Sequence, residues 1–150
     1  MRHTSTSSTR SLTAIAVGLA ALACGDATGV DPEDLVGTWS AFTAVATNPA
    51  DPAETADLVA MGVSITFIIE ATGRIETIFE FQDIVDRDVG MLTVTDDEFT
   101  LVIEGRPVTG TMSRQDDTLM MHIITGVEWD FGDDGLDEPA TLLLEMQRSR

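Results

Sequence analysis

The stretch VSITFIIEATGRIETIFEFQ, residues 63–82, carries the clearest structural pattern in the chain. In its first part every second residue from Val63 to Ile69 is apolar, which is the period of a β-strand with one buried face. The tripeptide ATG at 71–73 is typical of a hairpin turn, because Gly73 adopts a positive φ without steric cost. IETIFEFQ at 75–82 alternates again, so the stretch predicts an antiparallel hairpin.

The same period of two recurs on both sides of this hairpin. Further strands are predicted at 38–47, 89–94, 99–104, 108–113, 118–125, 127–131 and 140–147, most of them separated by tight turns. Eight or nine such strands predict an all-β fold, either an up-and-down antiparallel barrel of about eight strands or a two-sheet sandwich. The long connection at 48–62 is the exception, because its segment ETADLVAM is compatible with one or two helical turns.

The N-terminal residues have the pattern of an export signal. Residues 1–11 are hydroxyl-rich and basic, and residues 12–23 form an apolar run well short of the ~20 residues that span a bilayer. The single cysteine, Cys24, follows at once in ALACG, which resembles the lipobox of bacterial lipoproteins. This resemblance implies cleavage before Cys24, acylation of its thiol and amine, and lipid anchoring of an exported domain in the bacterial cell envelope. Gly25 after the cysteine implies the outer membrane rather than the inner one in a diderm host.

Other roles for Cys24 are restricted by its surroundings. With no second cysteine an internal disulfide is impossible, and no nearby base supports a nucleophile, so burial as a small apolar residue is the remaining alternative. The sequence therefore predicts a lipoprotein signal peptide at 1–23, a lipidated flexible tether at 24–34 and a barrel domain at 35–150.

The charge of the mature chain limits its partners. Residues 24–150 hold all 26 acidic residues against six arginines and no lysine, a difference of −20 charges. Such a field repels nucleic acid and anionic phospholipid head groups, so membrane contact is expected through the lipid anchor alone. An acidic exterior also keeps an anchored domain soluble.

The segment LVGTWSA, residues 35–41, resembles the start of the first strand in lipocalins and lipocalin-like lipoproteins, which have a calycin-type barrel. In that superfamily a G-x-W motif begins the first strand, and an arginine follows the last strand. The resemblance implies that Gly37 turns the chain at the closed end, that Trp39 plugs this end and that Arg148 packs across the tryptophan. It also implies that the connection at 48–62 covers the barrel mouth.

The acidic segment EWDFGDDGLDEPA, residues 128–140, partly follows a calcium-binding loop. Asp130, Asp134 and Gly135 fall at loop positions 1, 5 and 6, but Gly132 and Thr141 stand where positions 3 and 12 need oxygen ligands. The pattern favours an acidic hairpin loop, with Asp130 and Asp134 as weak metal candidates.

Catalytic motifs are missing from the sequence. His122 lies between apolar neighbours in LMMHII, and no serine has a nucleophile-elbow context. We therefore expect no enzyme and no cofactor.

The predicted function is a non-enzymatic binding module for a small apolar ligand. Large apolar side chains are proposed to line the barrel, namely Phe67, Phe79, Phe81, Met91 and Met121. Which of them point inward stays open, because a slip of one residue exchanges the two faces of a strand. The alternative is a solidly packed structural or interaction protein of the envelope that binds a basic protein partner.

Overall fold

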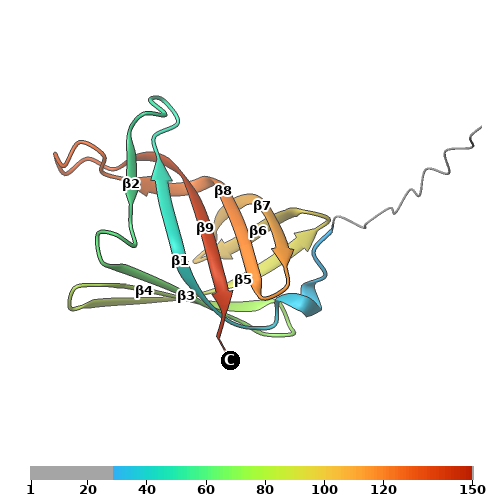
Figure 1. Ribbon diagram of the computed structural model, residues 1–150. Coiled ribbons are helices and arrows are strands. Elements are labelled where there is room, and N and C mark those ends of the chain that lie inside the picture. The colour runs from blue at the N-terminus through green and yellow to red at the C-terminus, as the bar shows by residue number, and fades with distance from the viewer. Residues whose placement is uncertain (1–28, 150) are drawn as a thin grey trace, which may run out of the picture.

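The computed structural model of the protein describes residues 29–149, which form a short 3₁₀ helix and nine strands (Figure 1). The elements are η1 (Pro32–Leu35), β1 (Gly37–Thr47), β2 (Thr55–Asp57), β3 (Val63–Ile69), β4 (Arg74–Phe81), β5 (Ile84–Thr95), β6 (Glu98–Ile103), β7 (Arg106–Gln115), β8 (Thr118–Trp129) and β9 (Glu138–Arg148). Within residues 29–149, no helix has the length and apolarity needed to cross a membrane.

Eight of the strands close into an up-and-down antiparallel barrel. From β3 to β9 each strand pairs with the next, β3 also pairs with β1, and β1 pairs with β9. The first and last strands lie side by side in Figure 1, with Trp39 opposite Arg148 and Thr47 opposite Thr141. This pairing confirms the predicted barrel and rules out the two-sheet sandwich. The short β2 lies outside the ring and pairs with residues 45–47 of β1.

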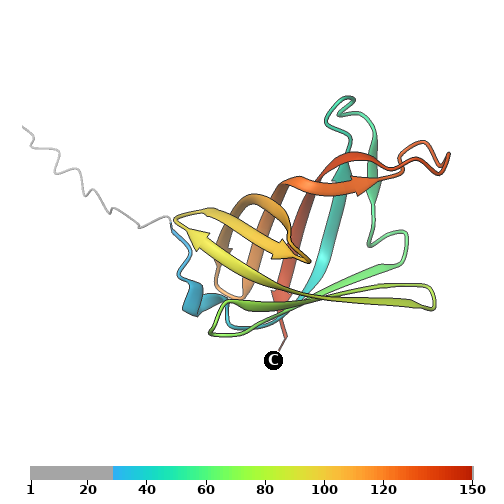
Figure 2. The same ribbon diagram turned by 180° about the vertical axis from the view of Figure 1, so that it is seen from behind.

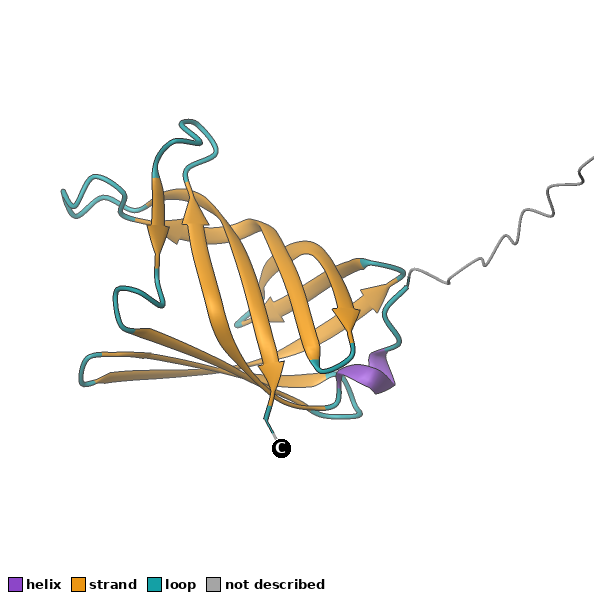
Figure 3. Cartoon of the chain, in the orientation of Figure 1, coloured by secondary structure: helices purple, strands orange, loops and turns teal. Residues whose placement is uncertain are grey.

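The two ends of the barrel differ. The floor is the end where β1 begins, and it holds η1 and the turns at 70–73, 96–97 and 116–117. The mouth is the opposite end, and it holds the connections 48–62 and 130–137 with the turns at 82–83 and 104–105. Figure 2 shows from behind that the loop after β8 and the β4–β5 turn extend to the same side of the molecule. Figure 3 shows the longer loops of the mouth in teal.

Residues 63–82 fold as the predicted hairpin. Val63 pairs with Phe81 and Ile69 with Ile75, and the inward positions of β3 are all buried. In the turn Gly73 has a φ of 80°, and a Cβ there would lie 2.8 Å from the carbonyl oxygen of Leu92. Glycine at this position therefore satisfies both the turn and the packing against β5.

Two expectations for the mouth are wrong. Residues 54–61 do not form helical turns, because Thr55–Asp57 add to the edge of β1 as β2 and a turn follows. The strand predicted from residue 89 begins already at Ile84, because pairing with β4 continues through the charged residues 86–88. Charged side chains are compatible with a strand where both of its faces approach solvent.

The described part of the predicted tether, residues 29–34, packs on the barrel floor. Val30 is buried, and its N–H donates to the carbonyl oxygen of Asp96 at 2.9 Å. The Arg114 guanidinium forms an ion pair with the Asp34 carboxylate at 3.1 Å. The domain therefore reaches back at least to Val30 rather than beginning at residue 35, because this segment carries an apolar side chain that the floor buries. The predicted signal peptide and residues 24–28, with Cys24, lie outside the described residues.

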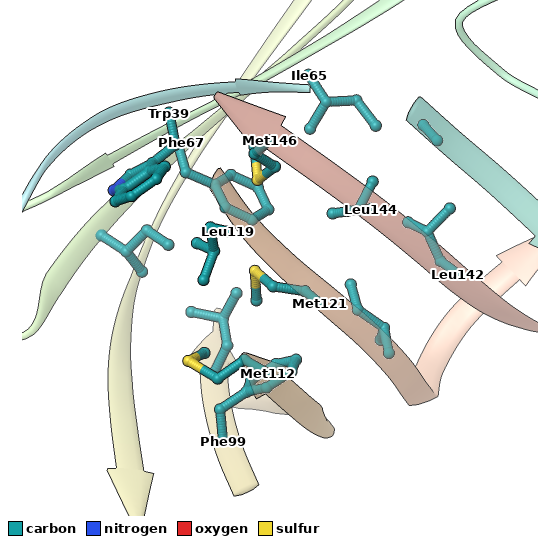
Figure 4. Packing of buried hydrophobic residues seen from close by; sticks show 14 of the residues in the cluster. Trp39, Ile65, Phe67, Phe99, Met112, Leu119, Met121, Leu142, Leu144 and Met146 are labelled. Carbon is teal, nitrogen blue, oxygen red and sulfur yellow. The ribbon is translucent and has the colours of Figure 1, made fainter. Parts of the chain in front are cut away.

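The floor half of the interior is filled with apolar side chains. Figure 4 shows Trp39, Phe67, Phe99, Met112, Leu119, Met121, Leu144 and Met146 packed together. They come from β1, β3, β6, β7, β8 and β9, and Trp39, Leu119 and Leu144 are fully buried. Because burial of apolar area contributes about 25 cal/mol per Å², this cluster supplies much of the stability of the fold.

Candidate ligand-binding site

A cavity of 330 Å³ lies inside the barrel between the packed floor and the mouth. Its walls come from strands β3 to β9 and from the connection after β1. The lining residues are Leu58, Ile65, Phe67, Thr77, Ile78, Phe79, Asp88, Leu101, Ile103, Val108, Ile123, Gly126, Val127, Glu128, Trp129, Leu142 and Leu144. Most of these side chains are apolar, and the volume falls in the lower part of the range of about 300–1,000 Å³ for small-ligand sites.

The barrel wall extends less far toward the mouth on the side of β6 and β7, because the β6–β7 hairpin is short. The pairing of β5 with β4 starts at Ile84, but its pairing with β6 starts at Gly90. Similarly, residues 127–129 of β8 pair with β9, whereas pairing of β8 with β7 ends at Thr125. The upper parts of β5 and β8 thus stand above the β6–β7 turn, and the cavity opens between them.

An irregularity in β8 shapes this opening. The register of β8 against β9 shifts between Ile123 and Val127, and Gly126 has a φ of 86° there. A Cβ at Gly126 would lie 2.7 Å from the carbonyl oxygen of Pro107. The bulge thus brings β8 close to the start of β7 and redirects its upper end, as bulges do beside binding sites.

The connection after β1 contributes one side chain to the cavity wall. Leu58 is buried, and its N–H donates to the carbonyl oxygen of Ala44 at 2.8 Å. Asn48 fixes the base of this connection, since its Nδ2 donates to Glu54 Oε2 at 2.8 Å. The connection thus covers part of the mouth through Leu58.

Of the five side chains predicted to line the barrel, Phe67 and Phe79 line the cavity. Phe81 lies on the same face of β4, nearer the rim, where it lines a second hollow of 500 Å³. Met121 points inward but is fully buried in the packed floor half.

The fifth prediction, Met91, is wrong. Its side chain lies on the outer surface and is 51% exposed. Gly90 and Leu92 occupy the inward positions on either side of it. Met91 therefore lies on the outward face of β5, whereas the prediction placed it on the inward face.

Sequence reasoning missed Asp88, which lines the cavity. It is paired with Thr77 of β4, which lines the cavity beside it. Asp88 lies in a charged segment that was not predicted as a strand. Leu92 and Val94 lie on one face of the strand, and counting back from them two residues at a time places Asp88 on the same face.

The cluster expected at the floor is present. The indole N–H of Trp39 donates to the carbonyl oxygen of Leu35 at 2.7 Å, and the Arg148 guanidinium carbon lies 4.7 Å from the ring centroid. The guanidinium also donates to the carbonyl oxygen of Asp34. Gly37 has a φ of 140°, and a Cβ there would face the Arg148 side chain. These contacts close the floor and do not reach the cavity.

The carboxylates of the acidic loop hold its own backbone. Asp130 accepts hydrogen bonds from the N–H groups of Asp134 and Gly135 at 3.2 and 2.7 Å, and Asp134 accepts one from Leu136 at 3.0 Å. Such bonds are those of a turn. In the part of the chain that the structure describes, no three His, Cys, Asp or Glu side chains are grouped to hold a metal ion.

His122 lies on the outer wall of the barrel, away from the cavity. It is exposed and pairs opposite Thr111 of β7, in a hollow of 150 Å³ that also includes Ser113. The histidine is therefore not placed to act on a molecule in the cavity.

Comparison with known proteins gives no family for the chain. No protein-family model matches it, and no curated protein matches it.

Proposed function

We propose that the protein is a non-enzymatic binding module that holds one small apolar ligand in the cavity of its barrel. The observation that carries this proposal is the 330 Å³ space with mainly apolar walls inside a closed eight-stranded barrel. A barrel of this size holds one small ligand where its own side chains do not fill the interior. The packed-barrel alternative is disfavoured by the same space, since a solid interior would leave no void of that size.

We also propose that this module is lipocalin-like. The up-and-down order of the strands supports this, as does the position of the G-x-W residues Gly37 and Trp39 at the floor beside Arg148.

The module is proposed to be a lipoprotein anchored through Cys24 in the bacterial cell envelope, at the outer membrane in a diderm host. Support comes from the N-terminal sequence. Mass spectrometry of the mature N-terminus tests this, with a diacylated or triacylated Cys24 as the expected product. A Cys24→Ser variant should leave the membrane fraction, and its unchanged retention there would refute the anchor.

Binding is tested by titrating residues 25–150, which contain every described strand, with the neutral fluorophore phenylnaphthylamine. We expect saturable binding that octanol displaces. Val108→Phe places a ring in the cavity and should abolish binding, whereas Val102→Phe, on the outer face of β6, should retain it. Absence of binding to the parent protein, or equal binding by both variants, would overturn the proposal.

A further inference from the structure

Carboxylates stand on both sides of the opening of the cavity. Asp88 projects from the part of β5 that extends above the β6–β7 hairpin, and it is partly buried. Glu128 lies across the gap on the upper part of β8, where it is exposed, whereas its neighbours Val127 and Trp129 pack against the core. Thr77 is the other lining residue with a hydroxyl or charged group. A ligand that enters the cavity from the mouth therefore passes the carboxylate of Asp88.

The arginines of this end of the barrel do not neutralise the opening. Arg87 points to the outer face of β5, where its guanidinium pairs with Glu76 at 3.0 Å. Arg106 is exposed at the start of β7 and is not part of the cavity lining. Further acids flank the opening at positions 80, 83 and 86 of the β4–β5 hairpin and at 130, 133, 134 and 137 of the loop after β8. The potential at the mouth is thus negative, which concentrates cations and repels carboxylates.

Aromatic rings accompany these charges. Trp129 lines both the cavity and the outer hollow of 500 Å³, in which it is joined by Phe81, Phe131, Asp133 and Asp137. Aromatic faces and carboxylates are the groups that hold an ammonium ion. The inner cavity, in contrast, is suited to an apolar tail.

From this arrangement we infer that the ligand is a cationic amphiphile, with its tail in the inner cavity and its positive charge at the acidic opening. The inference rests on the proposed function, because it concerns the same cavity. Fatty acids and other anionic lipids are excluded as preferred ligands, since their head groups would lie against Asp88 in a negative potential.

Three probes with the same tail test the inference. Octylamine, octanol and octanoate are titrated by calorimetry into residues 25–150. We expect octylamine to bind up to about fivefold more tightly than octanol, which is the upper end of what a partly exposed ion pair supplies, and octanoate to bind most weakly. The advantage of octylamine should shrink with added salt, because the Debye length falls from about 30 Å at about 0.01 M to about 3 Å at about 1 M.

The outcomes separate the inference from the proposed function. If octanoate binds as tightly as octylamine, the inference is wrong and the apolar binding module stands. If neither octanol nor the neutral fluorophore binds, the proposed function fails, and the inference fails with it.

Variants of single carboxylates test which of them interacts with the ammonium group of octylamine. Asp88→Asn keeps the side-chain shape and should lower octylamine affinity about fivefold without changing octanol affinity. Asp116→Asn, in a floor turn, removes the same charge far from the cavity and should change neither. Urea unfolding of each variant verifies the fold. Equal losses in Asp88→Asn and Asp116→Asn would show a general charge effect and overturn the inference.

Discussion

Trp39 shows how one residue joins distant parts of the chain. Its indole N–H reaches Leu35 in the segment before β1, and its ring lies against Arg148 at the end of β9. The tryptophan is fully buried, so it fills the floor while its single polar atom is satisfied. The start and the end of the barrel are thereby fixed to each other at one point.

Replacing Arg148 by methionine should destabilise the protein by about 1–2 kcal/mol. The variant keeps an apolar stem but loses the cation–π contact and the hydrogen bond to the carbonyl oxygen of Asp34. The free energy of unfolding in urea measures the loss. Arg106→Met, at an exposed position, is the matched control and should stay within about 0.5 kcal/mol of the parent. Equal effects in the two variants would contradict the role of the floor cluster.

Gly110 should tolerate no side chain. A Cβ there would lie 2.0 Å from the carbonyl oxygen of His122 on the neighbouring strand, so β7 and β8 would have to separate. We expect Gly110→Ala to cost about 3 kcal/mol, at the upper end of overpacking effects, as measured by urea unfolding. Gly132→Ala should be nearly neutral, because the atom nearest to a Cβ there is the Asp134 Cγ at 3.5 Å, an ordinary van der Waals distance. A stable Gly110→Ala protein would show that the strands yield easily at this point.

At the scale of elements, alternation in the sequence predicted most strands because one face of each meets a continuous core. It predicted the β3–β4 hairpin nearly residue by residue. It missed the first residues of β5, where Asp86 and Asp88 occupy the inward face beyond the core. There the strand is maintained by pairing with β4, which leaves no hydrophobic period in the sequence.

The cavity itself is not predictable from this alternation. Its opening depends on a bulge at Gly126 and on the unequal lengths of neighbouring strands. Both are relations between strands rather than properties of one strand. The prediction that Met91 points inward failed for a related reason. The neighbouring inward position is Gly90, which has no side chain to mark the inward face in the sequence.

Leu58 tests the role of the connection that covers the mouth. Leu58→Ala should destabilise the protein by about 2–4 kcal/mol, since it removes a buried side chain and leaves a void. The void joins the existing cavity, so ligands with a bulkier tail should gain affinity relative to octylamine. Val102→Ala, at an exposed position on the outer face of β6, is the control and should change neither property. Unaltered stability of Leu58→Ala would place Leu58 outside the core.

At the scale of the whole molecule, the dominant feature is negative charge. Residues 29–149 contain 25 acidic residues and five arginines, so the arginines cannot neutralise the carboxylates. The charges stand closer together in the folded barrel than in the unfolded chain. Their mutual repulsion therefore opposes folding, while it also keeps the domain soluble.

Salt should therefore stabilise the protein. Raising sodium chloride from about 0.01 M to about 1 M shortens the Debye length from about 30 Å to about 3 Å, which screens repulsion in the folded state more than in the unfolded state. We expect the midpoint of urea unfolding to rise across this range. A variant with Asp83, Asp133 and Asp137 changed to asparagine should start higher and rise less, because fewer like charges remain at the mouth. A midpoint that falls with salt would mean that attraction in ion pairs such as Arg74–Glu70, Arg87–Glu76 and Arg114–Asp34 outweighs the repulsion.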